Sequence, residues 1–300
     1  MDQISLQLLN EMAIRKTPSQ KKKFREFAVS EFAAKGYSAC FDNGFWGSNI
    51  IVGDPAAAHV IFCAHYDTPP ASPLPNKAYP LDIPSTMKAR LWPFAIASPF
   101  KIVPLALGMG LFAAFLSYIA ALGSVIILML AGPANKNNAN DNTSGVITLF
   151  KGAFALEPGK KSNVAFIFFD NEEKGLLGSF AFKKRYKEIA RSKLVFNFDS
   201  VGNGDQLYLF YPPAIQNTPE LLARIEHVAL SRGISRLFPS PPALFTSDHV
   251  NFRHGVVLTS LFERDGRAFT GDLHTKGDMD IDERLVDMAA NFLVGLSSAF

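Results

Sequence analysis

The chain has 300 residues, of which 48% are hydrophobic, so it is long enough to bury a substantial core in one large domain or two smaller ones. It carries 30 Lys and Arg residues against 27 Asp and Glu residues. This net charge of +3, without a basic face studded with aromatic residues, argues against a nucleic-acid-binding protein. The two cysteines, Cys40 and Cys63, exclude a disulfide framework and suit a reducing compartment.

The first part of the chain predicts two helices, over residues 3–15 and 19–35. The N-terminus contains acidic residues and has neither a continuous apolar stretch nor a small-residue cleavage site, so we expect no signal peptide. The densest basic run, KKKFRE, lies on the second helix and is interpreted as a solvated face. The next stretch, YSACFDNGFWGSNIIVGDP, alternates and turns as a hairpin of strands does.

Three short apolar runs further along end in acidic residues or histidine: AHVIFCAHYD, SNVAFIFFDNEE and SKLVFNFDSVGN. Two stretches with helical spacing lie between them, NTSGVITLFKGAFALE and GLLGSFAFKKRYKEIA. This alternation predicts an α/β fold, a three-layer sandwich whose central sheet is mostly parallel and has helices on both faces.

Charged side chains follow each predicted strand at its carboxyl end. The connecting loops of a parallel sheet converge at that end, so we expect these side chains to share one crevice with an aspartate that opens a helix on the same side. A loop histidine before the last amphipathic helix, DERLVDMAANFLVGLSSAF, is expected to reach the same place. The set consists of His65, Asp67, Asp141, Glu172, Glu173, Asp199 and His274.

Five carboxylates in one pocket cannot all stay ionised without cations. Histidine combined with carboxylate suits zinc, and less often manganese or cobalt, whereas calcium prefers oxygen ligands alone. One divalent ion leaves too many acids uncompensated, whereas two give each metal a histidine and a carboxylate, with one carboxylate bridging. Two ions about 3.5–4 Å apart can lower the pKa of a water molecule towards 7, which indicates hydrolytic chemistry.

Each of these residues also has an ordinary structural interpretation. Asp141 is compatible with a helix cap, Asp199 with a turn, and a single histidine is more often a hydrogen-bonded structural residue. Adjacent glutamates usually mark a solvated helix start. These interpretations give no reason for every cluster to fall at one end of the sheet, so we favour a shared site.

Residues 102–135 contain no charged residue, which is typical of a transmembrane helix, because a buried helix of a soluble protein normally shows a polar stripe. A single crossing would place His65 and Asp141 about 30 Å apart, so we expect an even number of crossings or none. Our hypothesis is that residues 85–133 form a membrane-associated hairpin that turns near Gly108, or one interfacial helix. Basic flanks on both sides predict a cytoplasmic catalytic domain, built from residues 1–84 and 134–300.

Five motifs follow one another along the chain: AHYDT, NDNTSG, DNEEKGLLGS, NFDSVG and LHTKGDMDID. In this order they resemble the co-catalytic zinc exopeptidases of metallopeptidase family twenty-eight, which includes bacterial leucine-type aminopeptidases and glutaminyl cyclases. The resemblance covers about residues 45–70 and 138–300. It implies a zinc-dependent aminopeptidase that acts on peptides, with a single-zinc glutaminyl cyclase-like acyltransferase or a metal-free binding homologue as alternatives.

The resemblance also implies a role for each residue of the set, with two zinc ions as cofactors. His65 and Asp199 would hold one zinc ion, Glu173 and His274 the other, and Asp141 would bridge them. Glu172 would be the general base that takes a proton from the attacking water and passes it to the leaving amine, and Asp67 would orient the ring of His65. Ser247, Asp248 and His249, in TSDHVNF, are expected to line the substrate pocket.

The chain departs from the family in the connection between its HYD and DN motifs. About 70 residues intervene where typical members have a short link. Because both motifs flank the expected metals, the insertion begins and ends at the mouth of the site. We therefore expect it to act as a lid, or to guide membrane-bound or hydrophobic substrates.

Overall fold

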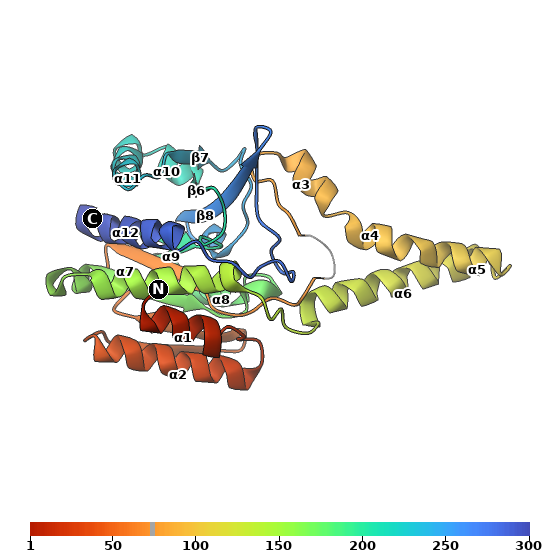
Figure 1. The fold of residues 1–300 in the computed structure, drawn as a ribbon, viewed down its shortest axis with the longest axis horizontal. Helices are drawn as coiled ribbons and strands as arrows, with labels where there is room; N and C mark the ends of the chain where they lie inside the picture. Colours follow the sequence, from red (N-terminus) through yellow and green to blue (C-terminus); the bar gives the residue numbers. More distant parts are fainter. Residues whose placement is uncertain (73–75) are drawn as a thin grey trace.

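The computed structural model describes residues 1–72 and 76–300, and in them a central sheet lies between two layers of helices (Figure 1). The α/β fold is thus confirmed. The strands are β1 (Ala39–Gly44), β2 (Gly47–Val52), β3 (Val60–His65), β4 (Val164–Phe169), β5 (Leu194–Phe198), β6 (Gln206–Tyr211), β7 (Arg236–Pro239), β8 (His254–Arg264) and β9 (Arg267–Phe269). Their order in the described part of the chain is β1-β2-β4-β3-β5-β8-β6-β7, with β9 paired to β8.

The sheet is mixed, and its parallel part is in the centre. Strands β4, β3, β5 and β8 run parallel to one another, whereas β2 pairs antiparallel with β4 and β6 pairs antiparallel with β8. Every residue of β3, β4 and β5 is buried, which explains why these strands are continuous apolar runs in the sequence. The predicted hairpin of strands is β1 and β2.

Helices cover both faces of the sheet (Figure 1). One face packs against α1 (Gln3–Glu11), α2 (Pro18–Ala34), α7 (Gly145–Ala155), α11 (Pro219–Ser231) and α12 (Glu283–Ala299), and the other against α8 (Leu177–Arg185) and α9 (Lys187–Ser192). The remaining helical elements are α3 (Ile83–Ala89), α4 (Trp92–Ala97), η1 (Ser98–Lys101), α5 (Ile102–Ala106), α6 (Gly110–Ala131), η2 (Ala139–Ser144), η3 (Pro158–Asn163), η4 (Glu172–Lys174), α10 (Pro213–Gln216) and η5 (Asp248–Asn251).

Phenylalanine side chains from the helices and strands form much of the core. Phe32 packs on Phe150, Phe166 and Phe168 beneath α2 and α7, with ring centroids 4.9–5.8 Å apart. Complete burial of one such side chain stabilises a fold by about 1.5–3 kcal/mol. Helix α2 begins where its sequence predicts, because Thr17 accepts a hydrogen bond from the Gln20 backbone N–H and the Gln20 side chain bonds back to Thr17.

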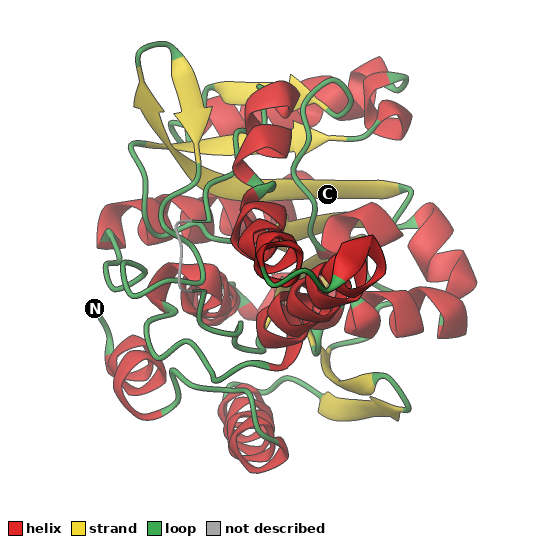
Figure 2. Cartoon of the chain, turned by 90° about the vertical axis from the view of Figure 1, so that its right-hand side faces the viewer, coloured by secondary structure: helices red, strands yellow, loops and turns green. Residues whose placement is uncertain are grey.

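The insertion forms a helical hairpin that projects from the end of the domain (Figure 1). Its first arm is α4, η1 and α5, broken by prolines that cannot donate a helical hydrogen bond, and its second arm is the long helix α6. The arms join at Gly108 and Gly110, whose φ angles of 71° and 81° lie in the left-handed region that favours glycine. In Figure 2 the hairpin points towards the viewer.

The hairpin carries its apolar side chains on the outside. Leu107, Leu111 and Phe112, near the turn, are 70–80% exposed. Within the described residues, Gly110–Leu128 is the one helical stretch long and apolar enough to cross a membrane, and 6% of it is buried. The second arm is therefore not a buried core helix.

Candidate active site

The loops after β3, β4 and β5 leave the sheet at the same edge. His65 at the end of β3 pairs in register with Phe169 at the end of β4, so the chains beyond both strands start side by side. The same edge receives η2 and the loop before α12. As a result six of the seven predicted residues line one cavity of about 400 Å³: His65, Asp141, Glu172, Glu173, Asp199 and His274.

Two groups of potential ligand atoms in this cavity share Asp141. Its Oδ1 atom lies 3.2 Å from Nε2 of His65, which is 3.9 Å from Oδ1 of Asp199. Its Oδ2 atom lies 2.9 Å from Nε2 of His274, which is 3.4 Å from Oε2 of Glu173. Zinc–ligand bonds of about 2.0–2.2 Å in a tetrahedron place ligand atoms about 3.4 Å apart, so both groups have the dimensions of a zinc site.

The charges of this cluster require compensation. Burial raises the pKa of Glu172 well above its ordinary value, and it also raises the pKa values of Glu173 and Asp199. Burial disfavours the charged form of His65, yet the negative charge of Glu172 and the adjacent Asp141 raise its pKa. The buried Oε1 atom of Glu173 has no hydrogen-bond partner among the described residues. A divalent cation would remove these costs, so the residues fit a metal.

Asp67 lies behind the cavity and holds three of the predicted residues. Its carboxylate accepts hydrogen bonds from the backbone N–H groups of Glu172 (2.9 Å) and Glu173 (3.3 Å), and it lies 3.5 Å from Nδ1 of His65. Burial opposes its ionisation, but the His65 ring and the N–H groups outweigh burial and lower its pKa. Sequence reasoning anticipated the contact with His65 but missed the contacts with the glutamate backbones.

Left-handed backbone conformations flank the site. Asn171 (φ 55°) precedes Glu172, Ser200 (φ 56°) follows Asp199, and His274 itself has φ 61°. Such angles are uncommon outside glycine and concentrate at functional sites. The turn at Asn171 explains how two adjacent glutamates at the end of a strand can take different directions.

Arg15 connects two of the loops that carry predicted ligands, and sequence reasoning missed it. Its side chain is fully buried and donates to the carbonyl of Tyr66 (2.5 Å), next to His65, and to Oγ1 of Thr143 (3.0 Å) in η2. Its backbone N–H also donates to Oγ1 of Thr68 (2.7 Å). These bonds explain why the first helix ends at Glu11 and not near residue 15, as its pattern predicted.

Lys21 similarly holds in place the turn that carries the two glutamates. Its Nζ atom donates to Asp170 (2.5 Å) and to Oδ1 of Asn171 (2.7 Å), and its side chain is 7% exposed. The interpretation of KKKFRE as a solvated face is therefore wrong for Lys21, although it holds for the exposed Lys22 and Lys23. The physical reason is a buried carboxylate 149 residues away in the chain, which no local pattern reveals.

Removing the guanidinium of Arg15 is expected to loosen the site. In Arg15→Met we expect the rate of zinc loss to a chelator to rise by about tenfold. The reason is that mutation of groups that orient metal ligands typically lowers metal affinity by 10–100-fold. The measurement is a chelator-competition time course, with far-ultraviolet circular dichroism as a check of folding. Lys23→Met, an exposed cation on α2, is the matched control, and equal rates in both variants would contradict this prediction.

Residues 123–293, more than half of the chain, match the model of the family described as Peptidase family M28. The chain belongs to peptidase family M28. The resemblance of the five motifs is thereby confirmed, and the protein is assigned to a family of zinc-dependent hydrolases. Among curated proteins, none matches this M28 sequence.

Solved structures of similar fold include exopeptidases and glutaminyl cyclases, the two kinds of enzyme anticipated from the motifs. A zinc-dependent exopeptidase from Parabacteroides distasonis has 16% identity and a TM-score of 0.63, with 98% of this chain and 96% of that chain covered. Glutaminyl cyclase from Porphyromonas gingivalis has 15% identity and a TM-score of 0.61, with 99% and 96% covered. A leucine aminopeptidase precursor from Bacteroides thetaiotaomicron has 14% identity and a TM-score of 0.57, with 97% and 93% covered. At these low sequence identities, the structural similarity is evidence for the fold of the M28 chain alone.

The TSDHVNF segment of this M28 chain lies partly behind the cavity. Thr246 lines the cavity, whereas Ser247, Asp248 and His249 are buried and are not among the described residues that line it. Burial raises the pKa of Asp248 to about 7. Ser247 accepts a hydrogen bond from the side chain of Asn197 (2.8 Å). The segment thus reaches the cavity at Thr246, and the expectation that Ser247, Asp248 and His249 line it is wrong.

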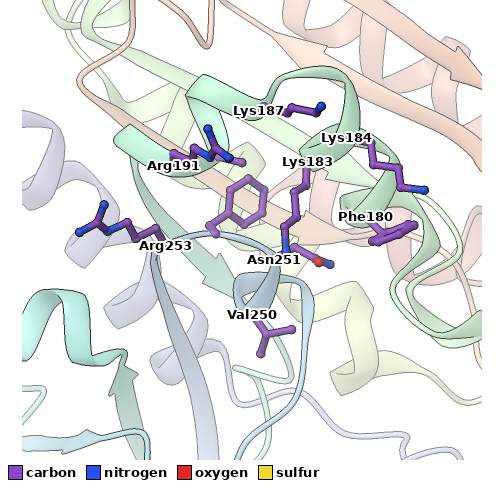
Figure 3. Close-up of a pocket in the computed structure, with 10 residues that line it drawn as sticks. Phe180, Lys183, Lys184, Lys187, Arg191, Val250, Asn251 and Arg253 are labelled. Carbon is purple, nitrogen blue, oxygen red and sulfur yellow. The ribbon is translucent and has the colours of Figure 1, made fainter.

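A second pocket, of about 480 Å³, lies on the face covered by α8 and α9 (Figure 3). Cations surround it, namely Lys183, Lys184, Lys187, Arg191 and Arg253. The described residues that line it include no aspartate, glutamate, histidine or cysteine. The described lining of this pocket therefore offers none of the metal ligands found in the cavity at the strand ends.

Proposed function

We propose that this protein is an aminopeptidase that uses two zinc ions to hydrolyse N-terminal peptide bonds. The observation that carries this proposal is the position of Asp141, whose two carboxylate oxygens face two different histidines, His65 and His274. Membership of a peptidase family supports a peptide as the substrate. Two metal sites that share Asp141 use five of the six His, Asp and Glu side chains that line the cavity and leave Glu172 free.

In this proposal five residues of the cavity are the metal ligands. His65 and Asp199 would hold one zinc ion, Glu173 and His274 would hold the other, and Asp141 would contribute to both sites. When bound, the pair of ions supplies Lewis-acid polarisation and an activated water.

Glu172 is the proposed general base. It lines the cavity beside His65 and Glu173 and belongs to neither of the two ligand groups that share Asp141, so its carboxylate is available to accept a proton. It takes a proton from the attacking water and gives it to the leaving amine. Asp67 is the positioning residue, because it fixes the backbone of both glutamates and the orientation of His65.

A single-zinc glutaminyl cyclase-like acyltransferase is the second candidate function, since glutaminyl cyclases are among the solved structures of similar fold. The complete set of five ligand residues favours two zinc ions and the peptidase. Purified full-length protein should therefore contain about two zinc ions per chain and release amino acids from aminoacyl reporter substrates. One zinc ion per chain, with cyclisation of N-terminal glutamine, would favour the cyclase. A metal-free binding homologue is the weakest alternative, because Glu172 and all the ligand residues are present.

We further propose that residues 85–133 anchor the catalytic domain, residues 1–84 and 134–300, to a membrane from its cytoplasmic side. The exposed apolar surface of the hairpin supports this proposal, because exposure of such a surface to water is unfavourable, whereas its burial in lipid is favourable. Lys88 and Arg90 precede the apolar segment and Lys136 follows it, as expected if both ends remain at the cytoplasmic surface.

Charges at the turn of the hairpin are expected to abolish membrane binding. A triple variant with aspartate at Leu107, Leu111 and Phe112 should reduce co-flotation with liposomes by more than about 100-fold, because one charge in the hydrocarbon region costs about 2.5–3.5 kcal/mol. Leu230→Asp, at a 60% exposed apolar residue on α11, is the matched control and should still float. Undiminished flotation of the triple variant would overturn the membrane hairpin.

A further inference from the structure

The described lining of the candidate active-site cavity combines the predicted metal ligands and Glu172 with one cation. The insertion contributes this cation, Arg90, which lies just after α3. Among the described residues that line the cavity, Arg90 is the one lysine or arginine. The rest of the described lining is uncharged and includes the apolar side chains of Leu176, Leu244, Phe245 and Leu273 and the polar side chains of Asn76, Thr246 and Thr270.

The helix before Arg90 has a fixed conformation. The Asp82 side chain caps α3 by accepting a hydrogen bond from the backbone N–H of Ser85 (3.1 Å). Oγ1 of Thr86 bonds to both the backbone N–H (2.7 Å) and the carbonyl (2.8 Å) of Tyr79, and the Arg90 backbone N–H donates to the Thr86 carbonyl (3.1 Å). The backbone of Arg90 therefore has a defined position at the end of α3.

The same segment is attached to the wall of the cavity. Ala78 exchanges two hydrogen bonds with Thr270, one to its Oγ1 atom and one from its backbone N–H, each of 2.9 Å. The backbone N–H of Leu244 donates to the carbonyl of Pro80 (2.8 Å). Because Ala78, Leu244 and Thr270 also line the cavity, α3 and Arg90 are tied to the site itself.

Arg90 is free to bind a ligand. Its side chain is exposed, and no carboxylate of the described residues forms an ion pair with it. The four carboxylates of the lining, those of Asp141, Glu172, Glu173 and Asp199 (−4), would balance two zinc ions (+4), so Arg90 would remain as the positive charge of the lining. A guanidinium presents a planar fork of N–H donors that matches a carboxylate. Arg90 is thus suited to a carboxylate, and the proposed aminopeptidase function places the amino terminus of the substrate at the predicted metal ligands.

We propose that Arg90 binds the free C-terminal carboxylate of a short peptide whose amino terminus lies at the predicted metal ligands, which makes di- and tripeptides the preferred substrates. This inference rests on the proposed aminopeptidase function. Peptides of two or three residues span at most about 7–11 Å, the scale of a small cavity, and longer chains would have to pass Arg90 without that contact.

The test compares Leu-Gly with its amide, Leu-glycinamide, which differ in the carboxylate alone. Binding to the zinc-loaded full-length chain in detergent is measured by calorimetry in a Glu172→Gln background, so that neither compound is hydrolysed. The unsubstituted Arg90 chain should bind Leu-Gly about tenfold more tightly than the amide. Adding Arg90→Gln should remove this preference by weakening the binding of Leu-Gly. Arg90→Lys in its place should keep part of the preference. Lys88→Gln, the matched control on α3, should leave the preference unchanged.

Equal affinity for the acid and the amide would overturn the inference. So would a preference that survives Arg90→Gln, or a loss of affinity for both compounds by the same factor, which would assign Arg90 a structural role. Turnover of the two compounds by the chain with Glu172 intact is measured in parallel. A carboxylate preference in binding without any hydrolysis would contradict the aminopeptidase and leave the Arg90 subsite standing, so the two proposals fail separately.

Discussion

Replacing Glu172 with glutamine is expected to lower the turnover number by about 10²–10⁴-fold while the zinc content stays at the wild-type level. Glutamine keeps the shape of the side chain but cannot accept the proton of the attacking water. The turn itself should persist, because Asp67 binds the backbone N–H groups of residues 172 and 173 and not their side chains. Steady-state kinetics on an aminoacyl substrate and zinc analysis by mass spectrometry measure the two quantities.

The neighbouring glutamate provides the matched control. Glu173→Gln removes the same charge one residue away, but Oε2 of Glu173 lies 3.4 Å from Nε2 of His274, so this variant should lose zinc as well as activity. Loss of zinc in Glu172→Gln, or full turnover in it, would show that the roles of the two glutamates have been assigned wrongly.

Replacing Asp141 with alanine is expected to empty both metal sites. Zinc should fall from about two ions per chain to less than about half an ion in a zinc-buffered solution, because Asp141 is the residue shared by both groups of ligand atoms. The loop should keep its conformation, since the carboxylate of Asp278 accepts hydrogen bonds from the backbone N–H groups of Asn140 (2.8 Å) and Asp141 (3.0 Å).

The control for this variant is Asp205→Ala, which removes an exposed carboxylate paired with Arg264 and should leave the zinc content unchanged. If Asp141→Ala retained one full equivalent of zinc, the two sites would be independent and Asp141 would not bridge them. Circular dichroism spectra of both variants show whether the fold is intact.

Much of the fold and the position of the candidate site follow from local sequence patterns. The buried strands β3, β4 and β5 are recognisable because strands covered on both faces must be apolar throughout. Their carboxyl ends are recognisable because charged residues appear there abruptly. Parallel strands then bring those ends to one edge, so His65, Glu172 and Asp199 could be placed together without any tertiary information.

Contacts between distant segments could not be predicted in the same way. Arg15 and Lys21 lie in polar stretches that are typical of solvated helix ends, and their burial depends on Thr143 and Asp170, more than 100 residues away. The two backbone hydrogen bonds to Asp67 depend on the exact path of the turn at Asn171. The place of Arg90 in the cavity depends on how the insertion docks on the core.

A crystallographic anomalous difference map, recorded at the zinc absorption edge from the full-length protein, tests the two-metal site most directly. The expected result is two peaks per chain on either side of Asp141, one beside His65 and Asp199 and the other beside Glu173 and His274. A single peak, or zinc bound away from Asp141, would contradict the proposed site.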